Sequence, residues 1–207
     1  MQIKVRKGQL PILIFNLCIL AGFFVHFFSR KNYEFVLYIG TIAFFLAVFI
    51  AANSKVYFPN VLLWGLTLWA LMHLSGGAVY IRQTRLYEII LIPLSETYPV
   101  LRYDQLVHII GFGAATVTMF YVLKPLLRPD IKTWTALSII VISAGLGIGA
   151  LNEIVECIAT AIMPDTGVGG YLNTALDLIA DLIGAIIAMV IIRLTSRLPE
   201  NPQTASS

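Results

Sequence analysis

The chain has 207 residues, of which 58% are hydrophobic and only 12% are charged. That charged fraction is about half of what soluble proteins carry, and the mean hydropathy of the chain is +0.85. A soluble core of this size could not bury so much apolar surface, whereas a lipid bilayer can. The formal net charge of +3 arises from 14 basic and 11 acidic residues, a balance that does not suit nucleic-acid binding. The composition predicts an integral membrane protein and excludes nucleic acid as a partner.

Six apolar segments are long enough to cross the roughly 30 Å hydrocarbon core of a bilayer as α-helices. In chain order they cover residues of about 11–28, 33–52, 58–81, 103–123, 134–160 and 171–193. The first segment follows a basic stretch, but it is longer than the apolar part of a signal peptide, and no cleavage motif precedes the second. We therefore expect an all-α, multi-pass bundle of about six transmembrane helices, in which the first helix is retained. The bundle forms a single domain over residues 1–195.

The distribution of Lys and Arg among the connections predicts which side of the membrane each connection faces. The N-terminus, the 53–57 and 124–133 loops and the C-terminal end from Arg193 onward together carry nine of these residues, and the connections on the other side carry five. Because positively charged connections tend to stay in the cytoplasm, both termini are expected to be cytoplasmic. Membrane lipids are the partners that this placement implies.

The longest connection, residues 82–102, lies outside in this orientation. Its apolar run from Leu86 to Leu94 is too short to span the bilayer and is interrupted by Glu88. We expect it to lie at the membrane interface or to re-enter the bundle as a flap. The Gly-rich 164–170 connection is expected to be a flexible turn, and the polar tail over residues 196–207 is expected to be disordered.

Apart from Arg193 at the very end of the sixth, no Lys or Arg falls inside a predicted span, whereas several acidic residues and histidines do. An ionisable group inside a membrane is costly, so each is a candidate for function. Those in the last four spans are His73, Asp104, His108, Glu153, Glu156, Asp177 and Asp181. Counted along the helices, they fall at one level, in the outer part of the membrane and below the 82–102 connection.

The spacing of these residues places them in pairs on single helix faces, because positions three or four apart project from the same side of an α-helix. The pairs are Asp104/His108, Glu153/Glu156 and Asp177/Asp181. Asn152 and Asn173 add hydrogen-bonding groups nearby, and small residues such as Gly145 and Gly149 favour close helix packing. The sequence therefore predicts one converging acidic and histidine site.

Each of these signals also has a purely structural interpretation. Protonated carboxyl groups can hold helices together by hydrogen bonds, and a lone histidine such as His73 is more often a packing residue. Asp104 with His108 suits an acid/base pair or an oriented metal ligand, and equally an ordinary helix start. Arg102 is either an interfacial anchor or a binder of an anionic headgroup.

Four motifs follow one another in the last four spans: His73-x-x-Gly76-Gly77-x-x-Tyr80, Arg102-Tyr103-Asp104-x-x-x-His108-x-x-Gly111, Asn152-Glu153-x-x-Glu156 and Asp177-x-x-x-Asp181-x-x-Gly184. Over residues of about 70–190 they resemble the YjdF-like family of small bacterial inner-membrane proteins. The last three spans are more distantly similar to the VanZ-like proteins associated with glycopeptide resistance. The chain departs from the YjdF-like pattern at Cys157, where that family usually has an aromatic residue. The resemblance implies a multi-pass protein of the plasma (inner) membrane, and the VanZ-like similarity implies cell-envelope chemistry.

The residues leave three functions open, of which the first is a metal-dependent membrane enzyme. Carboxylates and imidazoles in this arrangement suit Zn²⁺, Mn²⁺ or Fe²⁺, and a bound cation would activate water against a lipid-linked ester or phosphoester. In this hypothesis Asp104 and His108 form the acid/base pair, and Arg102 holds the headgroup. The expected metal ligands are Glu153, Glu156, Asp177, Asp181 and His73, with His108 as an alternative nitrogen ligand.

The second function is a proton- or cation-coupled transporter, in which the same carboxylates titrate and the 82–102 connection acts as an outer gate. The third is a non-catalytic membrane scaffold, whose acidic residues only hold the helices together. Of the three functions, the sequence favours the enzyme by a narrow margin. Its expected activity is that of a hydrolase or transferase acting on a lipid-linked or cell-envelope substrate.

Overall fold

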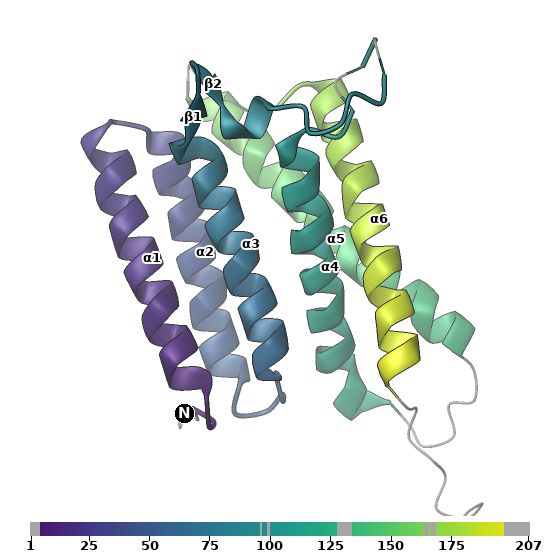
Figure 1. Ribbon diagram of the computed structural model, residues 1–207. Coiled ribbons are helices and arrows are strands. Elements are labelled where there is room, and N and C mark those ends of the chain that lie inside the picture. Colours follow the sequence, from purple (N-terminus) through teal and green to yellow (C-terminus); the bar gives the residue numbers. More distant parts are fainter. Residues whose placement is uncertain are drawn as a thin grey trace, which may run out of the picture.

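The computed structural model describes residues 5–95, 97–98, 100–127, 134–163, 166 and 169–196. Within these residues, six long helices run alternately up and down and form one bundle (Figure 1). They are α1 (Gln9–Ser29), α2 (Tyr33–Ala52), α3 (Asn60–Ala78), α4 (Tyr103–Leu123), α5 (Trp134–Ile162) and α6 (Tyr171–Thr195). Each is long and apolar enough to cross a membrane, so the prediction of six spans is confirmed.

The observed helix ends agree with the predicted spans to within a few residues, and the largest difference lies at the end of the third. Residues 79–81 were expected to be helical, but α3 ends at Ala78 and Val79 is extended. Tyr80–Ile81 then forms strand β1, which pairs antiparallel with β2 (Thr84–Arg85). The hairpin takes up backbone hydrogen bonds that a longer helix would have used.

The connection between α3 and α4 folds over one end of the bundle, which we call the link end (Figure 1). After the hairpin, a single 3₁₀ turn η1 (Leu86–Glu88) contacts both α3 and α4. The following chain is held by backbone hydrogen bonds from Tyr103 to Ile89 and from Leu91 to Leu101. Its apolar side chains, such as Leu94, remain exposed. The placement of this connection at the membrane interface or as a flap therefore stays a prediction.

The bundle divides into two halves with separate apolar cores. In the first half, Phe27, Phe35 and Leu74 pack together from α1, α2 and α3. In the second half, Phe120 and Met189 belong to a core that α4, α5 and α6 share. The packing of α3 against α4 joins the two halves.

The closest helix packing in the protein joins α4 to α6, whose contact is the most extensive of any helix pair described. A Cβ atom on Gly184 would collide with the carbonyl oxygen of Ile109 and would lie 3.0 Å from the backbone nitrogen of Gly113. A Cβ atom on Gly113 would in turn lie 3.3 Å from the carbonyl oxygen of Gly184. The two backbones therefore touch, as small residues at helix interfaces allow in membranes.

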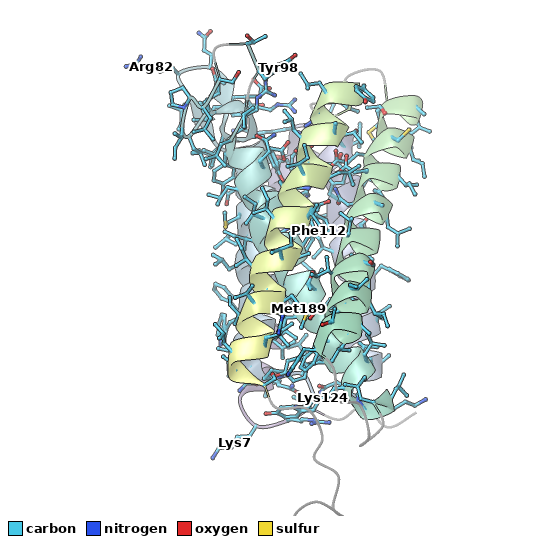
Figure 2. All side chains as sticks on the ribbon, turned by 90° about the vertical axis from the view of Figure 1, so that its right-hand side faces the viewer. Lys7, Arg82, Tyr98, Phe112, Lys124 and Met189 are labelled. Carbon is cyan, nitrogen blue, oxygen red and sulfur yellow. The ribbon has the colours of Figure 1, made fainter. Side chains whose placement is uncertain are left out.

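Several residues behind the sequence predictions lie outside the described part of the chain. They include the basic residues Lys4, Arg128, Lys132 and Arg197, most of the 164–170 connection and residues 197–207 of the tail. Among the described basic residues, Arg82 lies at the link end, and Lys7 and Lys124 lie at the opposite, amino-terminal end (Figure 2). The cytoplasmic placement of the termini stays a prediction.

Replacing Gly184 with Ala should destabilise the protein, because the new methyl group collides with the backbone of α4. Overpacking of this kind costs about 1–3 kcal/mol. Gly147→Ala is the matched control, since its Cβ meets nothing within 4 Å and Ala favours a helix over Gly by up to about 1 kcal/mol. Thermal unfolding of both variants in one detergent measures the difference. A Gly184→Ala variant that melts at or above the wild-type temperature would contradict this packing.

Single cysteines at the two ends should report the orientation of the bundle. Cys18 and Cys157 are free and are first replaced by Ser. In intact cells, a membrane-impermeant maleimide should then label Arg82→Cys, at the link end, but not Lys124→Cys, at the amino-terminal end. This result follows if the more basic connections are cytoplasmic. Labelling of Lys124→Cys alone would reverse the assignment.

Candidate functional site

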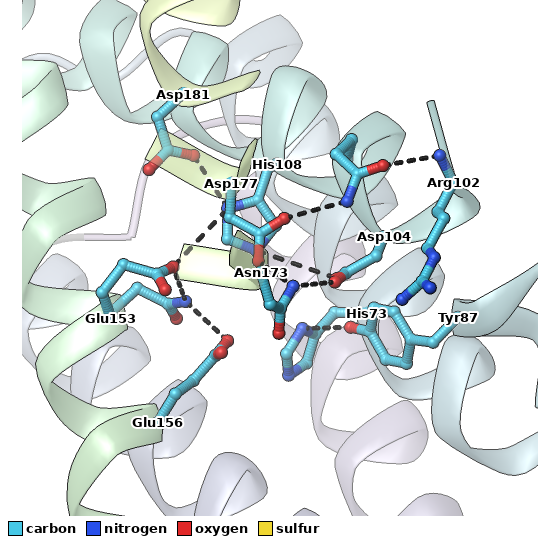
Figure 3. Close-up of polar contacts among 12 residues, drawn as sticks. His73, Tyr87, Arg102, Asp104, His108, Glu153, Glu156, Asn173, Asp177 and Asp181 are labelled. Atoms are coloured by element: carbon cyan, nitrogen blue, oxygen red, sulfur yellow. Dashed lines mark hydrogen bonds and ion pairs between the residues drawn. The ribbon is translucent and has the colours of Figure 1, made fainter. Parts of the chain in front are cut away.

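His108 on α4 is the centre of a buried polar cluster near the link end (Figure 3). Its Nδ1 atom lies 2.8 Å from Oδ1 of Asp181 on α6 and 4.0 Å from Oε1 of Glu153 on α5. Its Nε2 atom faces Asp104 on its own helix, 3.8 Å from Oδ1. Three helices therefore place acidic groups around one imidazole ring.

Asp177 on α6 is held by two neutral amide groups. The side chain of Gln105 donates a hydrogen bond of 3.2 Å to Oδ1, and that of Asn173 donates one of 2.5 Å to Oδ2. Asn173 also reaches Oδ2 of Asp104, at 3.4 Å, and so connects α6 to α4. Gln105 accepts a hydrogen bond of 2.6 Å from the backbone N–H of Arg102. The same residue thus caps the start of α4 and fixes an acid on α6.

The two glutamates of α5 share a different amide. Nδ2 of Asn152 donates a hydrogen bond of 2.9 Å to Oε1 of Glu156 and a longer one, of 3.5 Å, to Oε1 of Glu153. Both carboxyl groups are buried. One turn earlier along α5, Gly149 makes room for the carboxyl group of Asp181, because a Cβ atom there would collide with Oδ2 of that residue.

Three buried polar atoms of the cluster have no hydrogen-bond partner among the described residues: Oε2 of Glu153, Oδ2 of Asp181 and Nε of Arg102. A buried polar atom without a partner carries a large desolvation cost, and more so when the group is ionised. Asp181 turns its unpaired oxygen toward Gly149. Glu153 has one oxygen near His108 and the other free to bind a further group.

Two sets of three residues bring potential metal-binding atoms together, and His108 belongs to both. Asp104, His108 and Asp177 form one set, and His108, Glu153 and Glu156 form the other. Within each set, one ligand atom from each residue lies within 4.8 Å of the others. A carboxylate that receives Nδ1–H of a histidine orients Nε2 toward a metal, so the bond to Asp181 favours the set that contains Asp104.

Most of the residues predicted to form a site come together in the structure. Five of them supply the two sets, Asp181 contacts His108, and Arg102 lies beside Asp104 at the start of α4 (Figure 3). His73 belongs to neither set. Its ring instead contacts the rings of Phe35, Tyr38, Trp69 and Tyr87.

Tyr87 anchors the link to α3. Its hydroxyl lies 2.6 Å from Nδ1 of His73, and its ring packs so closely on Gly76 that a Cβ atom there would lie 2.6 Å from a ring carbon. Burial raises the pKa of Tyr87 well above its usual value, so the phenol keeps its proton near neutral pH. No signal in the sequence pairs Tyr87 with His73, because their contact depends on how the link folds back.

A second polar contact lies outside the cluster and involves Glu34 of α2. Its carboxylate lies 3.7 Å from the guanidinium of Arg85 in β2, and the hydroxyl of Tyr38 reaches it at 3.5 Å. The sequence offered no reason to join Glu34 to the other acids, and the structure pairs it with the link. Arg85 thus holds the hairpin to the first half of the bundle.

The fold and the site define an integral membrane protein with six candidate spans and a buried cluster of histidine and acidic residues. The chain belongs to the family described as Predicted membrane protein (DUF2238), whose model matches residues 11–197. No curated protein and no solved structure matches the chain.

Replacing either partner of the pair formed by His108 and Asp181 should destabilise the protein, because the other partner is left buried without its hydrogen bond. We expect His108→Gln and Asp181→Asn each to cost about 1–3 kcal/mol. The double variant should cost less than the two together, with a coupling of roughly 0.5–3 kcal/mol. Unfolding of the four proteins in one detergent measures that coupling.

The control for this cycle combines Asp181→Asn with His26→Gln, because His26 lies on α1 and makes no contact with the cluster among the described residues. These two changes should add to within about 0.5 kcal/mol. If the first pair adds equally well, the contact contributes no stability and the cluster is not held together by it.

Proposed function

We propose that this protein is a membrane enzyme that uses a divalent cation, bound beside His108, to hydrolyse or transfer a lipid-linked or cell-envelope substrate. The observation that carries the proposal is the convergence of the two ligand sets on one buried histidine. The unpaired and buried Oε2 atom of Glu153 adds to it. Carboxylates packed only as structural elements would be expected to pair all of their oxygens.

The donor atoms suit a metal of intermediate hardness. One imidazole nitrogen with two carboxylate oxygens is a ligand set that Zn²⁺, Mn²⁺ and Fe²⁺ accept, and three protein ligands leave a coordination position open for substrate. In our proposal these ligands are Nε2 of His108, Asp104 and Asp177, with Asp181 orienting the ring from its other side. A divalent cation bound there would offset the negative charge of the cluster and polarise an ester or phosphoryl oxygen.

The remaining polar residues have roles that follow from their positions. Glu153 keeps one oxygen unpaired and its other oxygen 4.0 Å from His108, so it suits a general base that accepts a proton from water. Arg102 has a buried, unpaired Nε beside Asp104, where the cluster approaches the link. A guanidinium in that position suits the anionic headgroup of a lipid. His73 takes no part in the reaction that we propose and instead positions the link through Tyr87.

The motif resemblance supports the choice of substrate. The motifs of the last four spans are similar to those of YjdF-like and, more distantly, VanZ-like proteins. By analogy between families, this similarity favours a location in the plasma membrane and chemistry on the cell envelope. The placement of the cluster at the link end supports the same choice, because the positive-inside prediction turns that end away from the cytoplasm.

Purified protein should contain on the order of one divalent ion per chain. The double variant Glu153→Gln/Asp177→Asn removes one carboxylate from each ligand set and should lose the ion while keeping its helical content. Glu88→Gln is the matched control, because Glu88 is an exposed acid in the link, and it should keep the ion. Elemental mass spectrometry and circular dichroism on the three proteins measure these effects.

The proposal fails if wild-type protein holds no metal and if added Zn²⁺, Mn²⁺ and Fe²⁺ leave its thermal unfolding unchanged. The carboxylates would then serve as proton stations of a carrier or as structural groups. Transport in proteoliposomes that responds to a pH gradient separates these two, because a purely structural cluster has no reason to respond.

A further inference from the structure

An apolar cavity of about 260 Å³ lies between the two halves of the bundle. Five helices line it, from α1 to α5, with side chains such as Ile42, Leu46, Leu66, Ala115 and Met119. It extends from Gln9 and Asn53 at the amino-terminal end to Asn152 and Val155 in the C-terminal half of α5. Apart from Asn152, which also donates hydrogen bonds to the glutamates, the residues that line this space do not belong to the acidic cluster.

The polar side chains in the cavity wall are already paired within the protein. Gln9 and Asn53 exchange two hydrogen bonds, of 3.2 and 2.7 Å, and Asn16 donates one of 2.7 Å to Thr67. Thr41 and Thr118 donate to backbone carbonyl groups of their own helices. Water in the cavity would therefore find few partners, and apolar cavities of this kind stay dry. A hydrocarbon is the chemistry that fits.

The cavity is accessible from the surface that faces lipid. Phe45 of α2 and Leu151 of α5 both line it, yet they are 38% and 51% exposed. In contrast to α3 and α4, which join the halves, α2 and α5 do not pack extensively against each other within the described residues. The exposed flanks of a membrane-spanning bundle contact acyl chains, so a chain can enter the cavity sideways from the bilayer.

The end of the cavity at Asn152, opposite the end at Gln9 and Asn53, adjoins the acidic cluster. Asn152 lines the cavity and donates hydrogen bonds to Glu156 and Glu153. Gly111, another lining residue, lies one helical turn after His108 on α4. A chain that fills the cavity would therefore hold its polar end against the cluster.

We propose that this cavity binds one hydrocarbon chain of a membrane lipid, and that the ester or phosphoester at the head of this chain lies at the cluster around His108. Its volume is close to the lower end of the roughly 300–1,000 Å³ of ligand sites, which suits a single chain. The identification of this lipid as the substrate rests on the proposed function, whereas the binding of the chain does not.

Filling the cavity should abolish lipid binding. Ala115→Phe introduces a ring into the cavity, and Ala150→Phe introduces the same ring on the exposed face of α5. Delipidated protein in detergent is titrated with lysophosphatidic acid and with monoacylglycerol, and native mass spectrometry counts the bound molecules. Wild type and Ala150→Phe should each bind one molecule, and the affinity of Ala115→Phe for the lipid should be lower by roughly tenfold or more. Equal binding by the two Phe variants overturns the proposal.

A measurement on the wild type alone avoids any effect of the variants on folding. Lysophosphatidic acid with a diazirine at the end of its chain is bound in detergent and photolysed, and the labelled residues are mapped. We expect labels on cavity residues such as Leu46 and Met119. Labels confined to outward-facing residues such as Ile140 would overturn the proposal. Comparison with the monoacylglycerol tells whether the phosphate contributes to binding.

The two proposals fail in distinguishable ways. If the wild type binds one lipid molecule per chain but contains no metal, the proposal of a cation site is refuted and the proposal of lipid binding in the cavity is kept. If the wild type contains metal but Ala115→Phe and Ala150→Phe bind lipid equally well, the proposal of lipid binding in the cavity is refuted and the proposal of a cation site is kept. Metal content should be unchanged in Ala115→Phe, because the substituted position contributes to neither ligand set.

Discussion

The contact between the backbones of α4 and α6 at Gly113 and Gly184 is the constraint on which the cluster depends. In a membrane, helices gain little from burying apolar surface against each other, so close approach has to come from small residues. Here that approach brings His108 of one helix within hydrogen-bond distance of Asp181 of the other. A side chain at Gly184 would separate the helices and leave two polar groups buried without partners, which is the costlier outcome.

The acidic groups gathered by this packing then need electrostatic compensation within the second half of the bundle. Five carboxyl groups surround one histidine, and in a medium of low dielectric constant they cannot all carry a charge without compensation. Three neutral amides, from Gln105, Asn152 and Asn173, donate hydrogen bonds to four of these groups. Amides stabilise carboxylates by orientation without adding charge, so the remaining imbalance must be met by protons or by a cation. In either case the carboxyl groups of the cluster are able to bind or release a proton or a cation.

The sequence predicted the six spans and the pairing of acids on helix faces, because both follow from periodicities of one helix at a time. It could not predict which nitrogen of His108 faces which acid, since that depends on how α5 and α6 are rotated against α4. Gln105 was missed for a similar reason, because Asp177, the acid to which its side chain donates, lies 72 residues away in the sequence. The end of α3 and the pairing of Tyr87 with His73 were missed because both depend on the folded link.

The two halves of the bundle differ in packing because they meet different demands. The half formed by α4, α5 and α6 holds ionisable groups, and buried polar networks stabilise a structure only when their partners are held in place. The boundary with α1, α2 and α3 is lined by apolar side chains and by polar groups that are already paired, so nothing polar forces it closed. A lipid chain can occupy that boundary at little cost, since it exchanges one hydrocarbon environment for another. Asn152 belongs to both environments, because it lines the boundary and its side chain donates hydrogen bonds to the glutamates. We expect selectivity for a lipid to arise there, because the residue faces the chain on one side and the reactive groups on the other.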